Sequence, residues 1–78
     1  MTSRKLDPID RDIIRVLAPL RRGVTPSQVA DSIGIHPSTA KLRMLRLWRK
    51  RLLDCRRKGN RLICKVNSGE LSRIRRLF

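Results

Sequence analysis

Aromatic and acidic residues are scarce in this sequence. Its 78 residues include one Trp, one Phe and no Tyr, so it lacks the interleaved aromatic side chains on which single-strand-binding proteins stack bases. It has one His and six scattered Asp or Glu residues, and no glycine-rich loop of the kind that binds phosphates in nucleotide enzymes. We therefore predict no catalytic residues and expect that the protein is not an enzyme.

Cysteines and long apolar runs are scarce as well. The two cysteines, Cys55 and Cys64, are too few for a disulfide scaffold, and with His36 they do not supply the four ligands of a structural zinc site. No apolar run approaches the ~18 residues of a membrane span, and the N-terminus lacks the apolar segment of a signal peptide. We expect a cytoplasmic, nucleoid-associated protein, or a nuclear one if its source has a nucleus, without cofactor, metal, membrane partner or small-molecule ligand.

Positive charge is abundant. Lys and Arg number 20 against 6 acids, which gives a formal net charge of +14. This excess predicts a polyanionic partner, for which nucleic acid is favoured over an anionic membrane. The alternative is that the basic surface is only solvated and binds no polyanion. Arg outnumbers Lys by 15 to 5, which favours bidentate contacts with phosphate or guanine. The length predicts one domain with a small core, which dimerisation or a cross-link would stabilise.

Two helices are predicted in the first half of the chain. The segment LDPIDRDIIRVLA has Asp7 as an N-cap and apolar residues at helical spacing, and Pro19 disfavours continuation of the helix. In the segment TPSQVADSIG, Thr25 and Gln28 have the spacing of a capping box, and Gly34 stands where a left-handed residue ends a helix.

A longer basic helix, a hairpin and a last helix follow. The helix is predicted over 37–51 and the hairpin over 53–66, with a two-residue Gly59-Asn60 turn that sets the register. A short helix, a tight turn and a longer basic helix form a helix-turn-helix pattern. The expected fold class is mainly α with a small β-hairpin wing, a winged helix-turn-helix of three helices, a hairpin and a C-terminal helix.

The charge lies mostly in the third helix and the hairpin. From Lys41 to Arg61 there are ten basic residues and one acid, Asp54. Because the major groove of B-DNA admits one helix, double-stranded DNA is the predicted partner, with helix 37–51 in the major groove and hairpin 53–66 as a wing. We expect a basic tail over 1–6, a DNA-binding domain over 7–66 and a dimerisation element over 67–78.

Two segments carry a resemblance to a known family. LDPIDRDIIRVL followed by VTPSQVADSIGIHPSTAKLRMLRLWRKRLL resembles the N-terminal DNA-binding part of Lrp/AsnC-type regulators and, more widely, the ArsR-like and MarR-like repressors of archaea and bacteria. The resemblance covers about residues 6–66. It implies a sequence-specific transcriptional regulator, which we expect to be a homodimeric repressor. His36 departs from the Ser that the family usually has at this cap, and the chain ends where an Lrp-type effector domain would begin, so a response to amino acids is not implied.

The resemblance and the charge pattern assign candidate DNA-binding residues. Those on the third helix are Ser38, Thr39, Lys41, Leu42, Arg43, Arg46 and Arg49. Those on the wing are Arg56, Arg57, Lys58, Asn60 and Arg61. Arg43 and Arg46 suit guanine, and Leu42 suits a thymine methyl group, with dimer packing or plain exposure as its alternative. Thr25 and Ser27 could bind backbone phosphate, although capping is the simpler role for Thr25.

The cysteines and Trp48 have two readings each, and a third set of side chains is assigned to a dimer interface. Opposed in the hairpin, Cys55 and Cys64 would be close enough for a disulfide, yet two buried thiols are favoured because cytosolic disulfides are rare. Trp48 is expected in the core or an interface rather than as a base-stacking platform. The leading candidates for the expected dimer interface are the first helix and a C-terminal apolar stripe of Leu71, Ile74 and Phe78.

Three alternatives to a regulator remain open. A low-specificity architectural, nucleoid or plasmid-partition protein would coat DNA, and the high arginine content suits it. A ribosomal-type winged helix would bind RNA, for which a pI near 11.8 is also suitable. An interaction module of a larger replication or transcription machine would lack measurable affinity for DNA.

Overall fold

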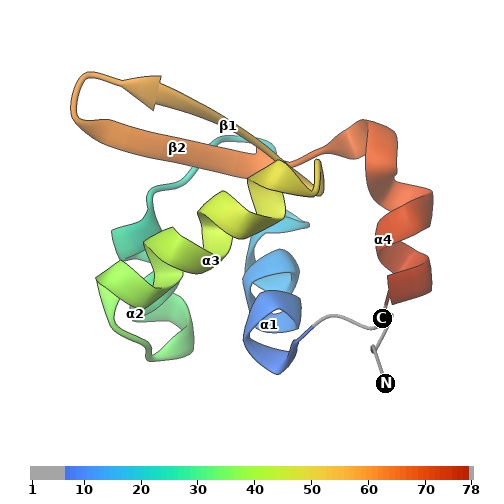
Figure 1. Cartoon of the computed structure of the whole chain (residues 1–78), viewed down its shortest axis with the longest axis horizontal. Helices are drawn as coiled ribbons and strands as arrows, with labels where there is room; N and C mark the ends of the chain where they lie inside the picture. Colours follow the sequence, from blue (N-terminus) through green and yellow to red (C-terminus); the bar gives the residue numbers. More distant parts are fainter. Residues whose placement is uncertain (1–6, 78) are drawn as a thin grey trace.

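The computed structural model describes residues 7–77, so the predicted basic tail over 1–6 and Phe78 lie outside the described residues. The chain forms three helices, a two-stranded hairpin and a short last helix (Figure 1). This arrangement confirms the expected fold class. In chain order the elements are α1 (Pro8–Leu17), α2 (Pro26–Ile33), α3 (Pro37–Arg49), β1 (Leu53–Lys58), β2 (Arg61–Val66), the 3-10 turn η1 (Ser68–Glu70) and α4 (Leu71–Leu77).

The first two helices begin and end as local chemistry dictates. The Asp7 carboxylate accepts a hydrogen bond from the Ile9 N–H at 3.0 Å and caps α1. Thr25 and Gln28 form both halves of the predicted capping box on α2. Gly34 ends α2 with φ at 72°, a left-handed conformation that glycine adopts without a steric penalty.

Helix α3 ends two residues before the predicted limit. Arg51 has φ at 63°, so the backbone leaves the helical path there. Its N–H donates to the Trp48 carbonyl at 2.9 Å, and the Leu52 N–H donates to the Leu47 carbonyl at 3.0 Å. The predicted extension of the helix to Arg51 is therefore wrong, and the Arg51 side chain is exposed.

The hairpin has the predicted register. Leu53 pairs with Val66, Cys55 with Cys64 and Lys58 with Arg61, around a Gly59-Asn60 turn in which Gly59 has φ at 62°. Alternation gives the hairpin an inner face that packs on the helices and an outer face that carries charge. We call residues 53–66 the wing.

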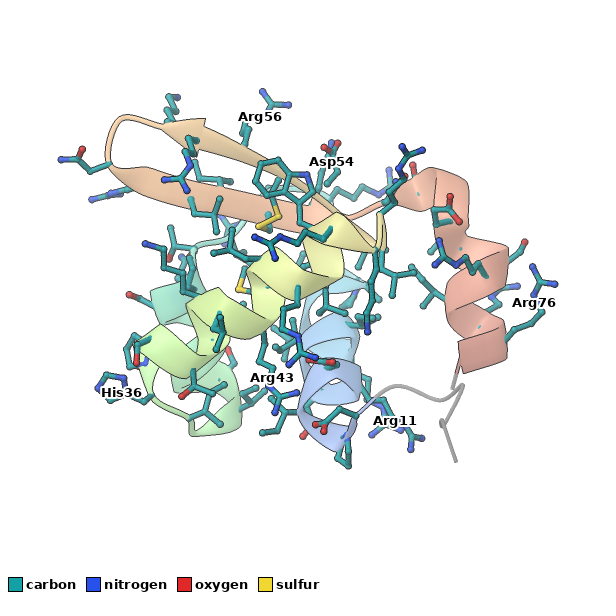
Figure 2. All side chains as sticks on the ribbon, in the orientation of Figure 1. Arg11, His36, Arg43, Asp54, Arg56 and Arg76 are labelled. Carbon is teal, nitrogen blue, oxygen red and sulfur yellow. A yellow bond between two sulfur atoms is a disulfide. The ribbon has the colours of Figure 1, made fainter. Side chains whose placement is uncertain are left out.

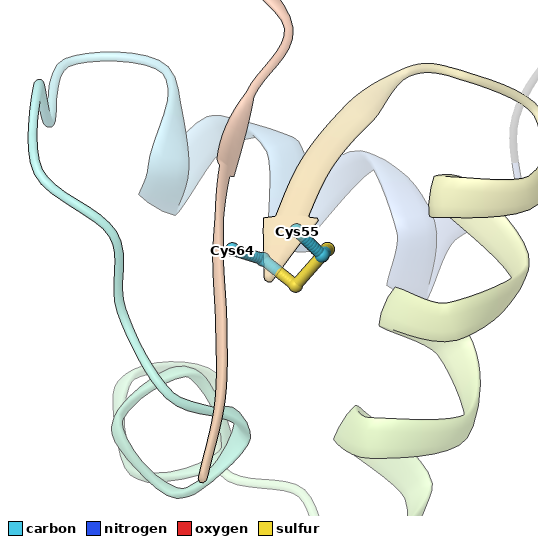
Figure 3. The surroundings of a disulfide bond; sticks show 2 residues. All are labelled: Cys55 and Cys64. Carbon is cyan, nitrogen blue, oxygen red and sulfur yellow. A yellow bond between two sulfur atoms is a disulfide. The ribbon is translucent and has the colours of Figure 1, made fainter. Parts of the chain in front are cut away.

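The base of the wing is fixed in two ways. The sulfurs of Cys55 and Cys64 are bonded, so the expectation of two thiols is replaced by a cross-strand disulfide (Figure 3). On the other side of β2, Cys64 exchanges two backbone hydrogen bonds with Val24, at 2.8 and 2.9 Å, so the loop before α2 runs beside β2 as a one-residue third strand. Gly23 lies against Ile63, where a Cβ atom would overlap the isoleucine side chain.

The core lies between α1, α2, α3 and the inner face of the wing. Its fully buried side chains come from all four elements, and Ile74 of α4 joins them. Ala30 and Ala40 are buried where α2 and α3 pack together, and their small side chains allow the two helices to approach closely. This packing fixes α3 beneath the wing (Figure 1).

Candidate nucleic-acid interface

Helix α3 is amphipathic in a way that leaves one face open. Ala40, Met44 and Leu47 are fully buried against the rest of the protein. The opposite face is exposed and carries Ser38, Lys41, Leu42, Arg46 and Arg49. Leu42 is 59% exposed, which is high for a large apolar side chain. Such a side chain, with cations beside it on an exposed helix face, can contact the apolar methyl group of thymine.

His36 caps α3 in place of the usual serine. Its Nδ1 accepts a hydrogen bond from the Ser38 backbone N–H at 3.1 Å and lies 2.7 Å from the Ser38 hydroxyl oxygen. Since an Nδ1 that accepts the backbone N–H also accepts the hydroxyl proton, the imidazole holds Ser38 in place. The imidazole therefore replaces the serine cap, and Ser38 retains its oxygen lone pairs on the exposed side.

Arg43 lies apart from the other predicted contacts of α3. Its Nη1 is 3.6 Å from Oδ1 of Asp7 and 3.9 Å from Oδ1 of Asp10, so the side chain is directed toward the start of α1 (Figure 2). Asp10 is buried, and this burial raises the pKa of its carboxyl group, while the charge of Arg43 opposes the rise. Arg43 thus joins α3 to α1 in this structure instead of lying on the exposed face.

The wing carries its charge mainly on the outer face. Arg56, Lys58 and Arg61 alternate with inner residues along the strands, and Asn60 lies at the turn. Arg56 and Asp54 point away from the helices (Figure 2). Arg57, paired with the buried Leu62, belongs to the inner face, as its parity predicts.

The wing tip, α2 and α3 meet around an open hollow of about 560 Å³. Its lining combines Thr25 and Ser27 from the start of α2, Ser38 and Lys41 from the start of α3, and Asn60 and Arg61 from the wing. Three groups of residues that the sequence assigned separately to DNA thus share one concave surface. Two helix N-termini and two cations make this hollow favourable for an anion such as a phosphate group.

A second hollow lies between α3 and β1, and sequence reasoning missed it. It has a volume of about 460 Å³ and is lined by Leu45, Trp48, Arg49 and Arg57. Trp48 is 37% exposed there, so of the two places expected for it, the core is excluded and an interface stays a prediction. The signal that could have revealed it is the spacing of Lys41, Leu45 and Trp48, which places all three on the side of α3 that faces the wing.

The proposed dimer stripe is divided by the structure. Ile74 is buried in the core of its own chain, Leu71 is 42% exposed, and Phe78 lies outside the described residues. The Arg73 guanidinium donates a hydrogen bond to the Lys50 carbonyl at 3.1 Å and thereby ties α4 to the end of α3. Leu71 is thus the one member of the stripe that the described part of the chain offers to a partner.

The described residues contain neither a group of metal ligands nor a membrane-spanning helix. Across 7–77, no three His, Cys, Asp or Glu side chains are grouped so that they could hold a metal ion. The helices of the same range are all too short or too polar to cross a membrane.

Comparisons with known proteins identify the fold. No protein-family model and no curated protein matches the sequence. Among solved structures, the homodimeric winged helix-turn-helix DNA-binding domain of a possible ArsR-family transcriptional regulator from Mycobacterium bovis superposes with a TM-score of 0.74 at 21% identity, over 91% of this chain and 64% of that chain. The PcaV transcriptional regulator of Streptomyces coelicolor, solved with its natural ligand, gives 0.79 at 26% identity, over 99% and 56%. The antimony-specific repressor AntR gives 0.71 at 22% identity, over 86% and 60%.

These matches establish a winged helix-turn-helix fold whose structural neighbours are transcriptional regulators. The ArsR-like part of the resemblance fits them, whereas they give no support to an archaeal origin. The chain spans between about half and two thirds of the length of these three proteins.

Proposed function

We propose that this protein is a non-enzymatic transcriptional regulator that binds double-stranded DNA, with the exposed face of α3 in the major groove and the wing on the adjacent backbone or minor groove. The observation that carries this proposal is one continuous surface, in which the cations of α3 and of the wing meet the polar start of α2 at the hollow by the wing tip. A DNA duplex presents a regular array of phosphates with which such a surface is complementary. The winged-helix neighbours, one of them a DNA-binding domain, support the same assignment.

The residues divide into two groups by what they can contact. Leu42 and Arg46 lie on the exposed face of α3 and are proposed to reach base edges. The remaining candidates hold the backbone or the minor groove; they are Thr25, Ser27, Ser38, Thr39, Lys41, Arg49, Arg56, Arg57, Lys58, Asn60 and Arg61. Arg43 is withdrawn from the base-reading group because it is paired with α1.

In more detail, we propose that the protein is a homodimer, that it represses transcription, and that it acts in the cytoplasm at the nucleoid. One structural neighbour is a homodimer and another is a repressor, which supports both parts by analogy. Two copies related by a two-fold axis would present two α3 helices ~34 Å apart to a pseudo-palindromic site that overlaps a promoter. The exposed Leu71 and the outer side of α1 are the surfaces proposed for the dimer contact.

The decisive experiment separates base reading from backbone binding. After in vitro selection of a preferred duplex, Arg46→Ala is expected to weaken binding to that duplex by roughly 5- to 150-fold, the value of a good bidentate base contact, and to change binding to random duplex little. Arg61→Ala is expected to weaken binding to both duplexes and to lower the slope of log affinity against log salt by about 1.

Arg76→Ala, on α4 and far from the wing, is the matched control for loss of one charge (Figure 2). Equal losses on selected and random DNA for Arg46→Ala would contradict the division between the two groups. Equal affinity for every duplex would point to a protein that coats DNA. A preference for RNA over duplex DNA would favour the ribosomal-type alternative.

A further inference from the structure

The function proposed above uses Arg49 and Arg57 but gives no role to Leu45, to Trp48 or to the hollow that these four residues line between α3 and β1. We call it the helix–wing hollow and define it by Leu45, Trp48, Arg49 and Arg57, which enclose about 460 Å³. Strand β1 is the strand of the wing that packs on α3, so the hollow continues the contact between the two elements outward to solvent. It lies on the exposed side of the protein beside Arg49, which belongs to the proposed DNA-binding face.

The hairpin register directs one arginine of the wing into this hollow. Arg57 pairs with Leu62, which is buried, so both side chains are on the inner face toward α3. Its neighbour Arg56 pairs with Ile63 on the outer face and points away from the helices (Figure 2). A shift of the register by one residue would exchange the two arginines.

Within residues 7–77, the polar groups of the hollow lack partners. Neither Arg49 nor Arg57 forms an ion pair there, and the indole N–H of Trp48 donates no hydrogen bond. Two guanidinium groups that face one hollow repel each other, and an anion placed between them removes that repulsion. Charge complementarity therefore points to an anionic occupant that also has an apolar part to contact Leu45 and the indole ring.

The sugar–phosphate backbone of DNA has this combination of groups. Each phosphate provides acceptors for guanidinium and indole N–H groups, and each deoxyribose provides an apolar surface. In B-DNA a single backbone strand separates the major groove from the adjoining minor groove. If α3 occupies the first and the wing the second, that strand has to pass between them, where the helix–wing hollow lies.

We propose that the helix–wing hollow binds the backbone strand that separates the two grooves, with Arg49 and Arg57 on either side of a phosphate and Trp48 donating a third hydrogen bond. Leu45 and the indole ring pack on the adjoining deoxyribose. This inference rests on the proposed function, because it needs a duplex seated on α3 and the wing. It assigns to Trp48, the single tryptophan of the chain, a direct contact with DNA.

The single tryptophan allows a direct test. In wild-type protein saturated with random-sequence duplex DNA, Trp48 emission is expected to become several-fold less accessible to acrylamide, a neutral quencher. Inorganic phosphate at the same total phosphate concentration is expected to leave the accessibility unchanged. A saturated complex in which Trp48 is quenched as readily as in free protein overturns the proposal, and so does full protection by inorganic phosphate alone, which would indicate a site for free anions.

Two substitutions test the cation and the indole N–H separately. Arg57→Gln is expected to lower affinity for random duplex about 5- to 10-fold and the salt slope by about 1, clearly more than Arg76→Gln, the control on α4. Trp48→Phe keeps an aromatic ring but removes the N–H, and a two- to five-fold loss is expected. Urea unfolding of each variant checks that the fold is kept.

The outcomes distinguish this inference from the function on which it rests. Wild-type protein that binds no duplex at all overturns the proposed function. Tight binding of duplex with Arg57→Gln no weaker than Arg76→Gln leaves the proposed function standing and overturns the helix–wing contact alone.

Discussion

Asp10 is the one charged side chain that is buried within residues 7–77, with 4% of its surface exposed. Its Oδ1 forms no hydrogen bond and lies 3.9 Å from the Arg43 guanidinium, close enough for an ion pair but too far for a hydrogen bond. Burial raises the pKa of Asp10, Arg43 counteracts the rise, and the nearby Asp7 adds to it; Lys50 and Arg46 act with Arg43. The packing of α1 against α3 therefore depends on whether the Asp10 carboxyl group is protonated.

The sign of this coupling leads to a prediction for Asp10→Asn. Because the folded state binds the Asp10 proton more readily than the unfolded chain, the free energy of unfolding contributed by this group falls as pH rises through the raised pKa. Asp10→Asn is expected to remove that decline and to be more stable than wild type at pH 7 by on the order of 1 kcal/mol. Urea unfolding at pH 7 and below pH 3.8 measures the effect. An advantage that grew on acidification would show that the sign is wrong.

Local patterns predicted the caps but not the pairing of Arg43. Thr25 and Gln28 are three residues apart, and their capping box needs only the backbone between them. The partners of Arg43 come from a different helix, and nothing in the spacing of either helix states which residues face each other across the contact. From sequence alone, a basic residue on α3 is therefore predicted to contact DNA, and only the packing of α1 shows that Arg43 has another partner.

The wing is the element that the sequence specified most completely. The Gly59-Asn60 turn and the alternation of apolar residues fix one register, and the structure has that register. The disulfide could not be decided in the same way, because opposed cysteines at this distance are compatible with thiols or with a bond. The Val24–Cys64 bridge was not predicted, since a single paired residue leaves no periodic pattern.

Removing the disulfide is expected to weaken the protein without altering its fold. The bond closes a loop with a sequence separation of 9 between its two cysteines. The loop-entropy relation gives about 2–3 kcal/mol for a loop of this size. Replacing both cysteines by serine is expected to lower the free energy of unfolding by that amount, and wild type in excess dithiothreitol should unfold at the same urea concentration as the variant. A midpoint insensitive to the reductant would mean that the bond contributes nothing to stability.

At the scale of the whole molecule, the cations are not confined to one side of the small core. The exposed face of α3 and the wing carry one group of cations, and Arg75 and Arg76 lie on α4 at the far end of the molecule (Figure 2). Helix α4 is held by the buried Ile74, by Arg73 bonded to the Lys50 carbonyl, and by little else in the described residues. The exposed Leu71 beside these contacts leaves an apolar surface on an otherwise charged end.

The oligomeric state tests whether that surface is a dimer contact. Leu71→Gln is expected to raise the dimer dissociation constant about 10-fold by removing the buried apolar area of one leucine on each protomer. Sedimentation equilibrium measures this constant, and circular dichroism checks the helix content. Arg75→Gln, a neighbouring change on the same helix, serves as the comparison. A dimer unaffected by Leu71→Gln would move the interface to α1 or to another surface.

The disulfide also determines what proteolysis can do to the wing. Trypsin cleaves after Lys and Arg, and the exposed candidates in the wing, Arg56, Arg57, Lys58 and Arg61, all lie between Cys55 and Cys64. A single cut at any of them opens the covalent ring but does not release a fragment, because the two new ends stay joined through the sulfurs. A protein cut once in the wing would gain one water molecule but remain a single covalent molecule until the disulfide is reduced. The segment between Cys55 and Cys64 thus contains several cleavage sites, yet a single cut there leaves the two parts of the protein covalently joined.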